Sequence, residues 1–156
     1  MKRLVLLATH VVALVMGFGL GVYFLPILTA PPAPDAATLD EMAAQSLYNS
    51  EVRRDLPGSD FLHWGQGEIR IGADMIVHRG KLSPGPDYKL YLVPTYADDE
   101  ASFEAVKDQA VLVGDVKSFS GFALPVPEGV DVEAFTTVVV WCESFGEFIT
   151  SAQYRP

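Results

Sequence analysis

The sequence contains one cysteine, Cys142, and only three histidines in 156 residues. A lone cysteine cannot close an intramolecular disulfide, nor can it supply the two thiols of a Cys-x-x-Cys oxidoreductase. A Cys-x-x-Cys-His sequence is also absent, which excludes covalent haem attachment of the cytochrome c type. Three scattered histidines do not have the spacing of a zinc site, so we expect no bound metal ion.

Basic residues are also few, with 11 Lys and Arg against 20 Asp and Glu and a formal net charge of −9. Lys2 and Arg3 carry +2 of this total, so the remainder of the chain carries −11. Such a surface repels nucleic acid, and no cluster of Lys and Arg reverses the repulsion. We therefore expect no nucleic-acid partner. A Gly-x-Ser-x-Gly sequence and a phosphate-binding glycine loop are missing as well, which disfavours a classical hydrolase or nucleotide-binding enzyme.

The segment 1–28 is the one long hydrophobic run. Its short basic start, Lys2 and Arg3, is followed by 22 residues from Leu4 to Leu25 that only Thr9 and His10 interrupt. A signal-peptide core usually has about 7–15 apolar residues, whereas a membrane-spanning helix needs about 20. The length therefore favours an uncleaved signal anchor, a transmembrane helix, over a cleaved signal peptide.

A cleavage site is also poorly formed. The best candidate, Leu28-Thr-Ala30, lacks one of the small residues expected there, and Pro31 follows it. With an uncleaved anchor, Lys2 and Arg3 place the N-terminus in the cytoplasm and the rest of this single-pass membrane protein in the periplasm or outside the cell.

Small residues recur at every fourth position of this segment, at Ala13, Gly17 and Gly21. Such a stripe lets two helices approach closely, which predicts a homodimer through the membrane helices. Glycine is also common in transmembrane helices for other reasons, so the stripe alone leaves both interpretations open.

A proline-rich linker is predicted at 29–37, followed by a short amphipathic helix at 38–50. Thr38 is the expected N-cap, because Glu41 stands three residues later as in a capping box. Apolar residues at helical spacing extend the predicted helix to about Asn49.

From position 58 the hydrophobic period changes to two, which predicts an all-β domain over 58–155. Turn-forming Pro and Gly residues separate short strands, a pattern typical of a single β-sandwich or barrel-like domain. The exception is 98–108, where we expect a helical turn or a loop. The predicted strands lie within the segments 68–71, 74–78, 87–93, 110–113, 136–142 and 147–154.

Cys142 ends one of these strands. Val138 and Val140 share its face, while Val139 and Trp141 lie on the other. Both faces are apolar, so we expect a central strand covered on both sides, with Cys142 buried. His78, which precedes Arg79-Gly80, is expected to be a solvated residue at a strand end.

Several motifs occur in an order that resembles a known family, the DM-thirteen domain or "electron transfer DM-thirteen". This domain accompanies DOMON domains in animal Skeletor-type proteins and occurs in bacteria as small exported or membrane-anchored proteins. The resemblance covers about residues 60–154. The motifs that carry it are Phe61-Leu-His-Trp-Gly-Gln-Gly-Glu-Ile-Arg-Ile71, Gly85-Pro-Asp-Tyr-Lys-Leu-Tyr-Leu-Val93, Val113-Gly-Asp-Val116, Ser120-Gly-Phe-Ala-Leu-Pro125 and Val138-Val-Val-Trp-Cys-Glu-Ser-Phe145.

The resemblance implies that Cys142 is redox-active, either as a bare thiol or as a ligand of non-covalent haem. His63, in the first motif, is then a second haem candidate, and Trp141 is a candidate electron carrier. The residues also allow an inert interpretation, in which Cys142 and Trp141 fill the core and His63 makes a structural hydrogen bond. Glu143 and Glu147 follow closely in sequence, and nearby carboxylates raise the pKa of a thiol.

Two functions follow. The first is a membrane-anchored extracytoplasmic domain with an electron-transfer or thiol-redox role centred on Cys142, supported by His63 and Trp141 and served by a redox protein partner. The alternative is a non-catalytic β-sandwich interaction module in which Cys142 is structural. Neither is a classical enzyme.

Overall fold

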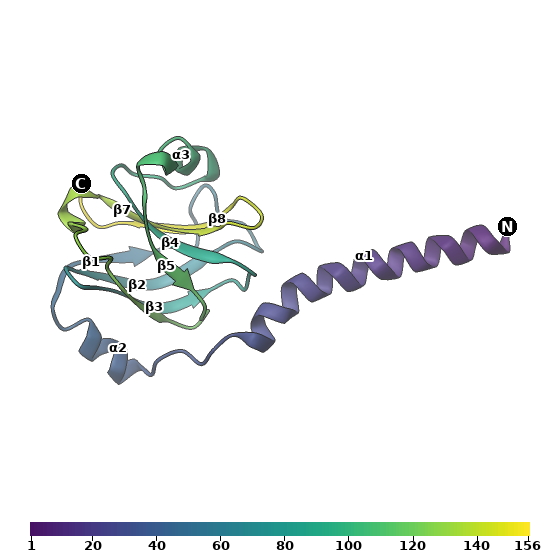
Figure 1. The fold of residues 1–156 in the computed structure, drawn as a ribbon, viewed down its shortest axis with the longest axis horizontal. Helices are drawn as coiled ribbons and strands as arrows, with labels where there is room; N and C mark the ends of the chain where they lie inside the picture. Colours follow the sequence, from purple (N-terminus) through teal and green to yellow (C-terminus); the bar gives the residue numbers. More distant parts are fainter.

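The computed structural model describes the whole chain, residues 1–156. Its first element, helix α1 (Lys2–Thr29), extends away from the β domain (Figure 1). This helix is long and apolar enough to cross a membrane, and the rest of the protein buries none of its residues. Such an apolar surface is consistent with a single-pass anchor.

The helix predicted at 38–50 is shorter and starts earlier. Helix α2 covers Ala36–Met42, and its N-cap is Asp35, not Thr38, because the Asp35 carboxylate accepts a 2.9 Å hydrogen bond from the Thr38 amide. The rest of the predicted helix is strand β1 (Ser46–Val52). Those residues hydrogen-bond to the edge of a sheet, a long-range pairing that outweighs the local helical spacing.

Eight strands form two four-stranded antiparallel sheets (Figure 1). One sheet has the order β1-β2-β3-β6 and the other the order β5-β4-β7-β8. The six predicted strands are present, and β1 and β6 are additional. The remaining strands are β2 (Gly65–Gly72), β3 (Met75–Leu82), β4 (Tyr88–Val93), β5 (Val111–Val116), β6 (Phe122–Pro125), β7 (Thr137–Cys142) and β8 (Glu147–Gln153).

The main core lies between the two sheets and takes one face of each strand, for example Ile76 of β3 and Leu90 of β4. A second cluster covers the outer face of the β7 sheet, where helix α3 (Glu100–Glu104) packs Phe103 against Trp141 with ring centroids 4.9 Å apart. This helix is the turn predicted within 98–108. Leu39 of α2 packs with Val77 on the outer face of the other sheet.

The sheets also meet at one edge, where the Ser50 hydroxyl of β1 donates a 2.6 Å hydrogen bond to the Gln153 carbonyl of β8. The domain is therefore mostly β and sandwich-like, as predicted at this coarse level. Strand β7 is an inner strand with every residue buried, which confirms the expectation of a covered central strand.

The prediction for His78 is wrong. This residue lies in the middle of β3, because the strand continues through Gly80 to Leu82, and its side chain is only 1% exposed. The strand needs a glycine at position 80, because a Cβ there would lie 1.9 Å from the Gln66 carbonyl oxygen and 2.8 Å from His78 Nε2. His78 Nε2 lies 3.3 Å from the Gln66 carbonyl, while Nδ1 is buried with no partner. Burial lowers the pKa of His78 to about 4.

Candidate functional site: a cavity at the end of strand β7

Cys142 is the last residue of β7 and lies between two paired neighbours, Tyr88 of β4 and Glu147 of β8. The β7–β8 register shifts by one residue between Val140 and Trp141. Bulges of this kind often re-aim side chains near functional sites. The turn after Cys142 is closed by a 2.9 Å hydrogen bond from the Gly146 amide to the Cys142 carbonyl.

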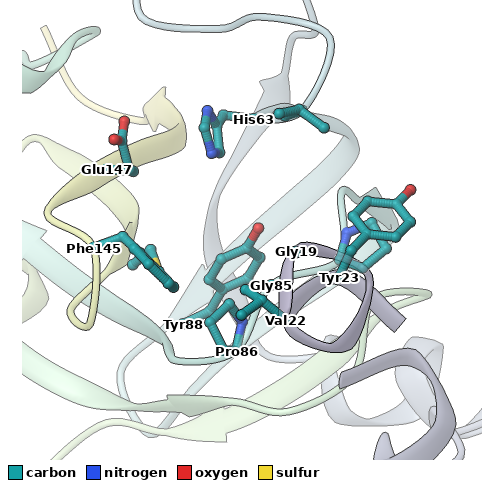
Figure 2. A pocket seen from close by; sticks show the side chains of 12 residues that line it. Gly19, Val22, Tyr23, His63, Gly85, Pro86, Tyr88, Phe145 and Glu147 are labelled. Atoms are coloured by element: carbon teal, nitrogen blue, oxygen red, sulfur yellow. The ribbon is translucent and has the colours of Figure 1, made fainter. Parts of the chain in front are cut away.

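A cavity of about 470 Å³ opens at this strand end (Figure 2). Its volume is within the range of about 300–1,000 Å³ that small-molecule sites usually have. The walls come from the end of β7 and its turn, from two loops of the β domain, and from helix α1 on the other side. The lining residues are Gly19, Val22, Tyr23, Leu62, His63, Pro84, Gly85, Pro86, Tyr88, Cys142, Phe145 and Glu147.

Cys142 is 3% exposed, yet it lines this cavity. Burial raises the pKa of its thiol, and the charge of Asp87 adds to the effect, while hydrogen bonding to the backbone of Phe145 acts in the opposite direction. The thiol is therefore protonated at neutral pH. It is placed beside a cavity but is not activated as a thiolate.

The carboxylate that acts on this thiol is Asp87, not Glu143. Glu143 faces the other side of the sheet, where it accepts a hydrogen bond from the Tyr91 hydroxyl and pairs with Lys107 Nζ at 3.0 Å. Burial favours the protonated form of Glu143, but these two partners outweigh it and lower its pKa. Glu147 does reach the cavity wall.

His63 lies on the wall of the same cavity, in a tight turn that Asp60 organises. One Asp60 oxygen accepts hydrogen bonds of 2.6 Å from the amides of Leu62 and His63. The other lies 3.2 Å from His63 Nδ1 and orients the ring. The structure thus places His63 and Cys142, which are far apart in the sequence, on the wall of one cavity.

Trp141 is not brought to the cavity. Its side chain lies on the opposite face of β7 from Cys142, in the second hydrophobic cluster. Lys107 Nζ lies 5.0 Å from the centre of the Trp141 ring, and the indole nitrogen is buried without a partner.

Sequence reasoning missed Tyr88 as a part of this site. Its buried ring forms a wall beside Cys142, and its hydroxyl lies 3.4 Å from Ser83 Oγ. Gly85 lies so close to this ring that a Cβ would approach ring atoms to 2.3–2.4 Å. The signal was available, since Gly85 and Tyr88 belong to one motif, but their contact could not be read from spacing.

Gly85→Ala is expected to lower the free energy of unfolding by about 1–3 kcal/mol, because the added methyl group must displace the Tyr88 ring. Urea unfolding measures the loss. The matched control is Gly114→Ala, whose Cβ would meet only Leu124 at 3.7 Å, an ordinary contact. Equal stability of the two variants would contradict the close packing of Gly85 on Tyr88.

The lining also indicates which ligands fit. Cys142, His63 and the lining tyrosines are side chains able to ligate haem iron, and Val22, Leu62 and Phe145 offer an apolar wall. However, no Lys or Arg lines the cavity, and Glu147 adds negative charge. The donors fit iron, but the charge does not suit the two carboxylates of haem. An uncharged, apolar ligand fits this lining better.

The fold and the cavity define the class of the protein. It is an antiparallel two-sheet β domain that follows an apolar N-terminal helix and carries its single thiol on a cavity wall. Residues 58–154 match the family described as Electron transfer DM13, and because the match covers more than half of the chain, the chain belongs to this family. No curated protein and no solved structure matches the chain.

Proposed function

We propose that this chain is a membrane-anchored electron-transfer domain whose redox chemistry takes place at the Cys142 cavity. The observation that carries the proposal is the shared cavity of Cys142 and His63. A cysteine that only fills a core needs no cavity of about 470 Å³ beside it. Membership of an electron-transfer family supplies the class of chemistry.

The environment of the thiol favours one form of this chemistry. Thiol exchange proceeds through the thiolate, and the raised pKa of Cys142 keeps the thiolate scarce at neutral pH. A redox-active ligand bound in the cavity, in contact with Cys142 and His63, is therefore a better redox centre than the bare thiol. Non-covalent haem fits this cavity less well, because the lining carries Glu147 and no Lys or Arg to pair with the two haem carboxylates.

The proposed topology follows from the ends of α1. Lys2 and Arg3 keep the N-terminus in the cytoplasm, so the β domain lies in the periplasm or outside the cell, where a redox protein partner would meet it. A Cβ placed on Gly17 or Gly21 would meet no atom within 4 Å, which leaves the small-residue stripe room for a second anchor helix.

A second candidate function is the interaction module with a structural cysteine. It is favoured by the burial of Cys142, which belongs to the main core cluster together with Val140. Under this candidate, the cavity has no redox ligand and Cys142 serves only as packing.

Alkylation and absorbance of the full chain, purified from its own membrane in mild detergent, test the proposal. We expect either visible absorbance from a bound ligand, or alkylation of native Cys142 by N-ethylmaleimide at a rate that rises with pH to a midpoint above the ordinary thiol value of about 8.5. Cys142→Ser controls for labelling elsewhere. A colourless protein whose cysteine reacts only after denaturation would contradict the redox proposal.

A further inference from the structure

Two loops of the β domain that contribute to the cavity wall expose large apolar side chains. Phe61 is 82% exposed and Phe145 is 54% exposed, and Leu62 is exposed next to Phe61. Leu62 and Phe145 line the cavity from separate loops. An exposed apolar patch on an otherwise acidic domain marks an interaction site.

Helix α1 forms the opposite wall through Gly19, Val22 and Tyr23 (Figure 2). A bilayer core of about 30 Å takes about 20 helical residues at 1.5 Å each. Counted from Leu4, the core ends near Tyr23, where a tyrosine suits the membrane surface. Gly19 then lies about 6 Å inside the outer boundary, from the same rise per residue. Loops that share a cavity with this segment must therefore reach the bilayer surface.

We propose that Phe61, Leu62 and Phe145 form a docking face that inserts into the outer leaflet of the bilayer, so that the Cys142 cavity opens into lipid. This inference rests on the membrane anchoring in the proposed function, but not on the redox chemistry. The occupant of the face is the bilayer because α1, which lines the same cavity, is the part of the chain that crosses it.

The connection between helix and domain favours this docking. Only Ala30 to Asp35 separate α1 from α2, an extended reach of about 19 Å at 3.1 Å per residue. So short a tether gives a high effective concentration of the domain at the surface, and weak apolar contacts then suffice. Asp60 and Glu147 near the mouth make neutral phosphatidylcholine a better surface than anionic lipid.

A lipid-facing mouth selects the ligand. Uncharged, membrane-soluble molecules can partition from the bilayer into the apolar cavity. Lipid and the docked loops block the access of charged, water-soluble molecules to it. The chemical class expected at Cys142 is therefore an uncharged, lipid-soluble compound, in agreement with the absence of Lys and Arg from the lining.

Photocrosslinking of the full chain in phosphatidylcholine vesicles tests the docking face. Benzoylphenylalanine replaces Phe61 or Phe145 in the test proteins, Tyr96 in a negative control and Leu14 in a positive control. Tyr96 is exposed but follows the far end of β4 from Tyr88, and Leu14 is exposed in the middle of α1. After irradiation, protein–lipid adducts are counted by mass spectrometry.

We expect several-fold more lipid adduct at positions 61 and 145 than at 96, with position 14 also positive. Adduct at 14, but no more at 61 and 145 than at 96, would overturn the docking face and leave the anchor intact. No adduct at 14 would reject the membrane anchor of the proposed function, and the docking with it. All four positions are exposed, so the label does not disturb the core.

Discussion

Lowering the pH from 7 to 4.5 is expected to lower the unfolding free energy of the β domain steeply. The part of this loss that His78 causes approaches about 3 kcal/mol as the pH nears 4. The pKa of His78 falls from an ordinary 6.5 in the unfolded chain to about 4 in the folded one. In this window the unfolded chain binds a proton that the folded chain does not. Stability is therefore full above pH 6.5 and is lost as the pH falls toward 4.

Urea unfolding at a series of pH values measures this slope. The non-titrating variant His78→Gln should show a much flatter profile, although burial of its amide lowers stability at every pH. The matched control is His63→Gln, which changes a partly exposed histidine and should keep the steep profile. A steep decline that persists in His78→Gln would show that other groups cause it.

Tyr88→Ala is expected to open the site. Removal of this large buried ring should cost about 3 kcal/mol or more of unfolding free energy, as for other buried aromatic residues. It should also raise the native-state alkylation rate of Cys142 by about tenfold or more, because the ring walls the cavity beside the thiol and access controls thiol reactivity.

Tyr91→Ala is the matched control for this effect. Tyr91 is a buried tyrosine of the same strand, but it faces the second hydrophobic cluster and not Cys142. This variant should also lose stability while leaving the alkylation rate near that of the parent under native conditions. Equal acceleration in both variants would mean that the thiol reacts through global unfolding and that Tyr88 does not guard it.

The sequence predicted the local features of the domain well. The period of two predicted a strand within 87–93, and the alternate residues Tyr88, Leu90 and Leu92 of β4 all lie in the main core. The apolar faces of 136–142 predicted an inner strand with Cys142 and Trp141 on opposite sides, as observed. These predictions succeed because side-chain alternation in a strand is a local property.

What the sequence did not predict depends on contacts between distant residues. Ser46–Val52 continues a helical spacing, but it forms a strand because the edge of β2 is available for pairing. His78 is buried because β3 continues to Leu82 instead of ending at Arg79-Gly80. The cavity is a further case. Tyr88 and Cys142 become neighbours only when β4 pairs with β7, and His63 lines the same cavity from the loop before β2, a strand of the other sheet.

Protein-film voltammetry of the full chain, purified from its own membrane and held in a lipid film, tests the central claim most directly. The account predicts a redox wave in the parent that disappears in Cys142→Ala but persists in Val140→Ala, which leaves a similar small cavity on the same face of β7. A wave that survives in Cys142→Ala, or a parent protein with no wave, would contradict the assignment of electron transfer to the Cys142 cavity.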